Sequence, residues 1–132
     1  LLSQVIAELS RSGAQATLSY VADHGETLFD GRCKRAGHGF ASLANYRVPW
    51  LVWLSPAWIA AHPERAARLR ERRQTPVSTL ALFPTLAGLA GFSIAAPSAH
   101  ADLGGPQWQA APREVVHFGD FDHGVRARAC DG

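Results

Sequence analysis

The sequence lacks several features that would assign it to a familiar class of protein. It has no methionine, opens on Leu1 and shows no signal peptide, so we expect an internal or C-terminal piece of a longer chain. A net charge of +2 is too small to indicate a polyanionic partner by itself. An apolar content of 47% argues against disorder, and 132 residues fit at most one domain with a reasonable core.

Charged side chains are absent from residues 74–99, which raises the question of a membrane span. Pro76, Pro84 and Pro97 divide this stretch, however, and its hydroxyl groups and glycines lower its apolar content. The pattern instead favours a buried helix of a globular domain that ends at Gly91. Pro84 should bend this helix or lie near its start.

Only two cysteines are present, Cys33 and Cys130. An even count in an extracytoplasmic protein permits one disulfide, and closing so long a loop stabilises on the order of a few kcal/mol. Two free thiols fit the sequence equally well, so both alternatives stay open.

Two apolar runs have the composition of buried strands. Residues 16–22 and 48–54 suit strands that are covered on both faces, as in a parallel sheet. Residues 23–46, between them, are predicted to form a long functional loop. We therefore predict an α/β fold with a mostly parallel sheet covered by helices, and a candidate C-terminal hairpin formed by residues 115–118 and 125–129.

Apolar spacing and proline positions predict three further helices, over residues 1–9, 56–61 and 63–73. The five arginines of the third helix spread around its circumference, which is typical of a solvated face. Glu64 and Arg68 form an i,i+4 pair of favourable orientation on it. Residues 93–112 are rich in Ala, Pro, Gly and Ser and are expected to be irregular, with no patterned partner for Asp102.

Potential metal ligands follow the first predicted strand. Asp23 and His24 offer a carboxylate oxygen and an imidazole nitrogen, which can share one divalent ion, typically Zn²⁺. Gly25 would allow a sharp turn there, and His38 lies fourteen positions after His24, between two glycines. Ligands bind at the carboxyl ends of strands in α/β sheets, so these residues predict a metal site. A surface turn capped by Asp23, with His24 in solvent, is the alternative.

Four segments occur in an order that is found in a known family of enzymes. They are Asp23–Leu28, Gly37–Gly39, Arg47–Ser55 and Phe83–Gly91. The sequence resembles the C-terminal half of the sulfatase-like domain of bacterial phosphoethanolamine transferases, in the alkaline phosphatase superfamily. The resemblance covers residues 1–95, and Asp-His-Gly-Glu is its most specific part. It implies that residues 1–132 are the C-terminal portion of an alkaline-phosphatase-type catalytic domain.

The resemblance also implies roles for single residues. Asp23 and His24 match two zinc ligands, and His38 matches a histidine that stabilises the transferring phosphate or protonates its leaving group. Glu26 is expected to orient one of the ligands. The family's threonine nucleophile and remaining acidic ligand precede this block, and nothing among the 22 residues before Asp23 fits them. Cys33 lacks the Cys-x-Pro-x-Arg pattern of a sulfatase nucleophile, so the visible chain should be catalytically incomplete.

By this resemblance the parent enzyme would move phosphoethanolamine from a phospholipid donor to an envelope glycolipid such as lipopolysaccharide. It would act at the periplasmic face of the inner membrane with Zn²⁺ as cofactor, its membrane anchor lying outside this chain. The implied partners are the missing N-terminal half and the two lipids, without nucleic acid, and an open sheet edge could pair with another copy. Two alternatives remain: a sulfatase or phosphodiesterase of the same superfamily, and a non-catalytic binding module that keeps the fold.

Overall fold

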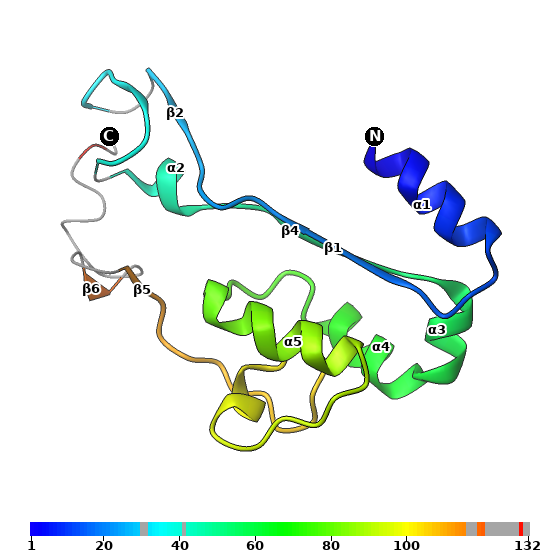
Figure 1. Cartoon of the computed structure of the whole chain (residues 1–132). Coiled ribbons are helices and arrows are strands. Elements are labelled where there is room, and N and C mark those ends of the chain that lie inside the picture. Colours follow the sequence, from blue (N-terminus) through cyan, green and yellow to red (C-terminus); the bar gives the residue numbers. More distant parts are fainter. Residues whose placement is uncertain (30–31, 41, 116–118, 121–129, 131–132) are drawn as a thin grey trace. The chain divides into compact units, whose positions relative to one another are not determined.

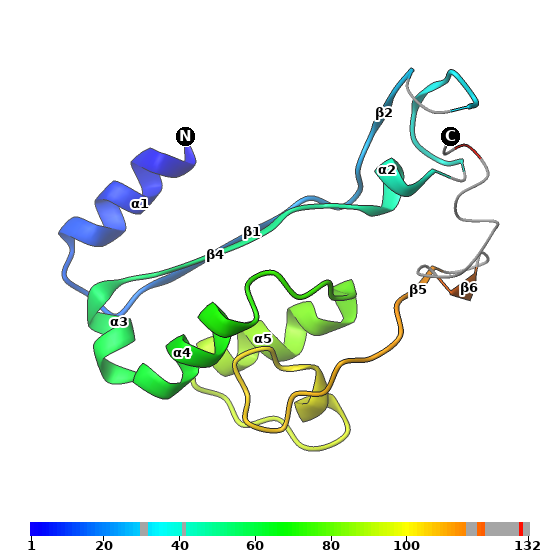
Figure 2. The same cartoon turned by 180° about the vertical axis from the view of Figure 1, so that it is seen from behind.

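A computed structural model of the chain describes residues 1–29, 32–40, 42–115, 119–120 and 130 (Figures 1 and 2). The chain divides into two compact units. Unit 1 comprises Leu1–Ser19 and Leu51–Ala111, and unit 2 comprises Tyr20–Trp50 and Pro112–Gly132. Unit 1 holds the longer helices, whereas unit 2 holds two short hairpins and the residues of the predicted metal site.

The α/β class is confirmed, but the sheets are smaller than predicted. Strand β1 (Thr17–Val21) pairs with β4 (Trp50–Leu54), at the two places where apolar runs predicted strands. The short strands β2 (Thr27–Leu28) and β3 (Ala36–Gly37) pair antiparallel, as do β5 (Glu114–Val115) and β6 (Gly119–Asp120). In the part of the chain that the structure describes, each of the three sheets has two strands.

Burial of the β1–β4 pair also differs from the prediction. Tyr20 and Leu51 are exposed by 45% and 41%, so the strands are half-buried instead of being covered on both faces. Towards the C-terminus, β5 pairs with β6. The predicted partner at residues 125–129 lies outside the described residues.

The expected long loop over residues 23–46 contains regular structure. It includes β2, β3 and the short helix α2 (Leu43–Tyr46), whose first turn is capped by the Ser42 hydroxyl accepting from Ala44 N–H. Strands of two residues and a helix of one turn are too short to leave a periodic signal in the sequence, which is why this prediction was wrong.

The helices of unit 1 end within two residues of their predicted ends, and Pro84 lies near the start of the last of them, as predicted. They are α1 (Leu2–Arg11), α3 (Pro56–Ala61), α4 (Pro63–Glu71) and α5 (Leu82–Leu89), with the 3₁₀ turns η1 (Thr79–Ala81) and η2 (Ser98–Ala101). Ser55 caps α3 by accepting from Trp58 N–H, and its hydroxyl also donates to Ala14 O at 2.8 Å. Among the described residues, no helix is long and apolar enough to cross a bilayer.

The core of unit 1 is small and lies between α3, α4 and α5 (Figure 1). Trp58, Ala66 and Leu89 are buried and in contact, and Val52 and Leu54 of β4 pack against them from the strand side. The indole N–H of Trp58 donates to Leu89 O at 3.2 Å, so the largest core side chain leaves no polar atom unsatisfied.

Two arginines of α4 and its C-cap residue, Arg72, bind the loop that follows η2, which corrects the prediction of a solvated face. Arg65 Nη1 contacts both carboxylate oxygens of Asp102, at 3.0 and 2.8 Å. Arg68 Nε donates to Gly104 O at 2.7 Å, and Arg72 Nη1 donates to the carbonyl oxygens of Leu103 and Gly105. Their spacing places the three side chains on one face of the helix. The contacts could not be predicted, because most of the groups that these arginines bind are backbone carbonyl oxygens of a distant loop.

The Arg65–Asp102 pair is expected to stabilise unit 1. The Asp102 side chain is only 9% exposed and that of Arg65 21%. Asp102→Ala should lower the free energy of unfolding by about 3 kcal/mol, because it leaves a partly buried guanidinium without its partner. Urea unfolding followed by tryptophan fluorescence measures the change. Glu64→Ala is the control, since Glu64 also pairs with an arginine of α4 but is 87% exposed, and should change stability by less than about 0.5 kcal/mol. Equal losses in both variants would contradict this assignment.

Candidate metal centre

The register of the β2–β3 hairpin brings two predicted site residues together. Thr27 lies opposite Gly37, so the preceding residue Glu26 and the following residue His38 face one another at the open end of the hairpin. Glu26 Oε2 is 3.7 Å from His38 Nδ1. Residues twelve positions apart in the sequence therefore share one site because two short strands pair in this register.

His24 completes a cluster of three potential metal ligands. One donor atom each from His24, Glu26 and His38 lies within 4.8 Å of the other two, and the two imidazole ring centroids are 4.0 Å apart. Two ligands of one tetrahedral zinc ion are about 3.3 Å apart, given bonds of about 2.0–2.1 Å. Small side-chain adjustments of exposed groups would bring this nitrogen- and oxygen-containing donor set to that spacing, so it fits a divalent transition metal.

Asp23 adjoins this cluster through His24. Its Oδ2 is 3.9 Å from His24 Nε2, and its Oδ1 accepts the backbone N–H of His24 at 3.0 Å. His24 Nδ1 lies 2.9 Å from Gly25 O, and since a carbonyl oxygen only accepts, Nδ1 carries the proton in this contact. That tautomer leaves the Nε2 lone pair directed to the side where the Asp23 carboxylate lies.

Glycines give the site its backbone path, although for different reasons. Gly37 and Gly39 on either side of His38 have φ values of +102° and +87°, a region that other residues rarely adopt. Gly25 has no such φ, so a left-handed backbone is not the reason for glycine there. A Cβ at Gly25 would lie 1.8 Å from Ala44 O and 2.9 Å from Arg47 O, and the absence of a side chain therefore lets the site loop pack directly on α2.

A buried pair of polar residues anchors the hairpin to α2, and sequence reasoning missed it. Thr27 is 2% exposed and donates its hydroxyl to Asn45 Oδ1 at 2.8 Å, while Asn45 Nδ2 donates to Phe40 O at 2.9 Å. Nothing in the local pattern distinguishes these residues from ordinary loop residues. Nearby, burial raises the pKa of the Tyr46 phenol.

The structure decides between the two states left open for the cysteines. Cys33, in the loop between β2 and β3, forms a disulfide with Cys130. Arg32 N–H donates to Cys130 O at 2.7 Å beside it. The loop of the hairpin is thereby fixed covalently to a residue close to the C-terminus.

Comparison with known proteins assigns the family. A model of the sulfatase family matches residues 1–92. This chain belongs to the sulfatase family. The resemblance drawn from Asp-His-Gly-Glu and its flanking segments is therefore confirmed, and the matched range contains all four predicted site residues.

Two curated relatives are phosphoethanolamine transferases. The chain is 31% identical over 75 residues to phosphoethanolamine transferase CptA of Salmonella typhimurium, which covers 54% of this chain and 13% of the relative. It is 24% identical over 92 residues to phosphoethanolamine transferase EptC of Escherichia coli, covering 67% of this chain and 16% of that protein. The chain thus matches less than a fifth of the length of either relative.

Solved structures show the same fold. The C-terminal periplasmic domain of EptC from Escherichia coli superposes with a TM-score of 0.78 at 23% identity, covering 92% of this chain and 36% of that chain. Its complex with zinc superposes with a TM-score of 0.73 at 24% identity, covering 84% of this chain and 31% of that chain. The protein is therefore a sulfatase-fold domain similar to those of phosphoethanolamine transferases, and it spans about a third of the matched structures.

Gly25→Ala tests the packing of the site loop on α2. The added methyl group would meet backbone carbonyl oxygens, which cannot move aside as a flexible side chain does, so we expect a loss of more than about 2 kcal/mol from unit 2. The imidazole NMR signals of His24 and His38 should both shift or broaden. Gly91→Ala is the control: it has open space around it and a positive φ, and should cost about 1 kcal/mol in unit 1 without moving those signals. Unchanged imidazole signals in Gly25→Ala would contradict the argument.

Proposed function

We propose that this chain is the metal-holding portion of a zinc-dependent phosphoethanolamine transferase. The observation that carries the proposal is the convergence of His24, Glu26 and His38, with Asp23 beside His24, where the chain leaves β1. The two curated relatives support the transferase class, and the zinc complex of the EptC domain supports the choice of metal.

Asp23 and His24 are the proposed zinc ligands. They present an oxygen and a nitrogen 3.9 Å apart, and the contact of His24 Nδ1 with Gly25 O directs Nε2 for coordination. Bound zinc lowers the pKa of a coordinated hydroxyl and offsets negative charge on a phosphoryl oxygen. Glu26 either joins this set or orients it, since its carboxylate reaches the same cluster.

His38 is the proposed residue for the phosphoryl group. An imidazole can donate a hydrogen bond to a phosphoryl oxygen or give a proton to the leaving group. Its glycine neighbours leave the backbone without side chains on either side, so a bulky phosphodiester has access to the ring. Its side chain is 58% exposed, which agrees with a position at the substrate side of the site.

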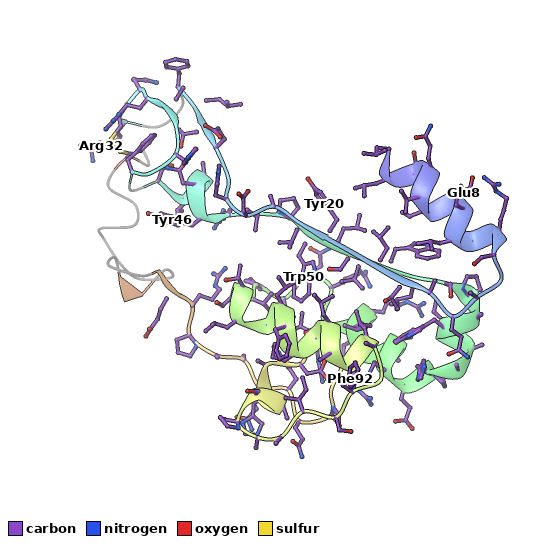
Figure 3. All side chains as sticks on the ribbon, viewed as in Figure 1. Glu8, Tyr20, Arg32, Tyr46, Trp50 and Phe92 are labelled. Atoms are coloured by element: carbon purple, nitrogen blue, oxygen red, sulfur yellow. A yellow bond between two sulfur atoms is a disulfide. The ribbon has the colours of Figure 1, made fainter. Side chains whose placement is uncertain are left out.

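The nucleophile is proposed to come from outside this chain. Thr17 lies within β1, and Glu8 of α1 pairs with Arg11. Neither belongs to the same unit as the metal cluster. Figure 3 marks Glu8 on α1 and Tyr46 on α2 as reference points for the two units. The remaining part of the domain would supply a threonine and an acidic ligand, and the membrane anchor would precede it.

The proposed donor is a phospholipid and the proposed acceptor an envelope glycolipid, at the periplasmic face of the inner membrane. Both follow from the resemblance to the transferases and the periplasmic EptC domain. A sulfatase or phosphodiesterase is the second candidate, because the same family model describes sulfatases and a metal site serves hydrolysis equally well. A binding module that keeps the fold without catalysis is the third.

Metal retention should depend on individual site residues. Asp23→Ala and His24→Ala should each weaken zinc binding by more than about tenfold, because each removes a ligand. In the longest natural form of the protein that contains this chain, His38→Ala should reduce turnover far more than it reduces zinc content. Isothermal titration with zinc and metal analysis of the purified protein check these outcomes, with the exposed Glu71→Ala of unit 1 as control. Zinc loss in His38→Ala equal to that of His24→Ala would make His38 a ligand, and unchanged zinc binding in both Asp23→Ala and His24→Ala would overturn the site.

Transfer and hydrolysis are separated by assaying the longest natural form of the protein that contains this chain. With headgroup-labelled phosphatidylethanolamine as donor and lipopolysaccharide as acceptor, we expect the label to appear on the glycolipid. Release of free phosphoethanolamine alone, or cleavage of aryl sulfates alone, would identify the hydrolase instead. Zinc retention without either activity would favour the binding module.

A further inference from the structure

The loop end of the β2–β3 hairpin combines exposed apolar and cationic side chains. Leu28 and Phe29 are exposed by 76% and 67%, although both are large and apolar. Arg32, Lys34 and Arg35 follow them and are also exposed. We call these five residues the hairpin tip, and Figure 3 marks Arg32 within it.

Backbone and side-chain contacts fix the conformation of the hairpin tip. Thr27 is buried and bonded to Asn45, so the strand alternation turns Leu28 outward. Phe29 N–H donates to Arg35 O at 3.2 Å, which extends the ladder beyond β2. Phe29 has φ +63°, a conformation that is a real outlier for a bulky side chain. Backbone strain of this kind persists where surrounding structure imposes it, and here it presents an apolar ring to solvent.

Covalent and polar contacts hold the rest of the tip. The Cys33–Cys130 disulfide and the bond from Arg32 N–H to Cys130 O fix the loop between the two strands. The guanidinium of Arg35 lies 4.8 Å from the centroid of the Phe40 ring, which orients the side chain without neutralising it. The tip therefore keeps its cations close to its apolar pair.

Positive charge is concentrated in this part of the chain. Residues 27–47 contain four basic residues and a single acidic one, Asp30, whereas the remainder of the chain contains nine basic and ten acidic residues. The segment thus carries a net charge of +3. Residues 63–73 carry the same net charge, but Arg65, Arg68 and Arg72 of that segment bind the loop after η2. A surface with this sign of charge and two protruding apolar groups complements an anionic lipid surface, where cations meet headgroups and apolar groups enter the acyl boundary.

We propose that the hairpin tip docks on anionic phospholipid bilayers, with Phe29 and Leu28 inserted and Arg32, Lys34 and Arg35 at the headgroups. Phe29 lies three residues beyond Glu26, at most about 10 Å along the chain, so docking brings headgroup phosphates close to the metal cluster. The role of docking rests on the proposed function, because docking would bring a phospholipid substrate to the site. Vesicle binding itself requires neither metal nor turnover.

Vesicle co-sedimentation of the whole chain in EDTA tests the proposal. The probe is vesicles of equal parts phosphatidylethanolamine and phosphatidylglycerol, with pure phosphatidylcholine vesicles as comparison. Binding should favour the anionic vesicles and weaken with salt. Phe29→Ser should lower the affinity at least about tenfold through lost insertion. Lys34→Glu should lower it about 25-fold, because it reverses one charge near the surface.

Two matched controls separate the tip from the rest of the surface. Phe92→Ser alters a phenylalanine of unit 1 that is 69% exposed, and Arg70→Glu reverses an exposed charge of α4. Both should bind anionic vesicles as the parent does, and thiol titration should show an intact disulfide in every variant. Equal binding to phosphatidylcholine, no binding, or equal losses in the control variants would each overturn the proposal. Binding to nucleic acid in place of vesicles would overturn it as well.

The outcomes distinguish this inference from the proposed function. Docking without any zinc retention would support the lipid-docking surface and contradict the metal site. Zinc retention without docking would contradict the lipid-docking surface and support the metal site.

Discussion

The β2–β3 register is the constraint on which the candidate site depends. Each strand has two residues, yet the pairing of Thr27 with Gly37 sets Glu26 opposite His38. A slip of one residue would turn the side chains of a strand to its other face, and the cluster would not form. The buried hydrogen bond between Thr27 and Asn45 fixes β2 against α2, and Asn45 Nδ2 donates to Phe40 O, three residues beyond β3, so both strands of the hairpin are tied to the same helix.

Stability and chemistry are assigned to different parts of the chain. Unit 1 contains the aromatic core at Trp58 and the arginines of α4 that bind the loop after η2. The described residues of unit 2 include almost no buried apolar side chain, and they are held by one disulfide, one buried polar pair and the close packing of Gly25 on α2. Single substitutions in unit 2 can therefore change the geometry of the site without disturbing the aromatic core of unit 1.

The sequence predicted elements well where they were long and apolar. Residues 17–21 and 50–54 are strands, and Ser55-Pro56 starts a helix at the predicted residue, because these features depend on local composition and capping. It also selected Asp23, His24, Glu26 and His38 for one site through a family resemblance. It could not predict the hairpin that joins them, because four paired residues leave no periodic pattern. It also could not predict the loop bound by the arginines, because residues that are distant in the sequence give no local sign of their contact.

Exposure of the cluster would give the proposed lipid-docking surface a chemical purpose. The side chains of His24, Glu26 and His38 are 42%, 48% and 58% exposed, so water has ready access to them within this chain. Phosphoryl transfer to a hydroxyl other than water requires that water be excluded from the reacting centre. A hairpin whose base holds the cluster and whose tip enters a bilayer would place the lipid surface against that open side. Membrane docking would then favour transfer over hydrolysis without any change in the metal ligands, and the choice between the two reactions would lie in what covers the site.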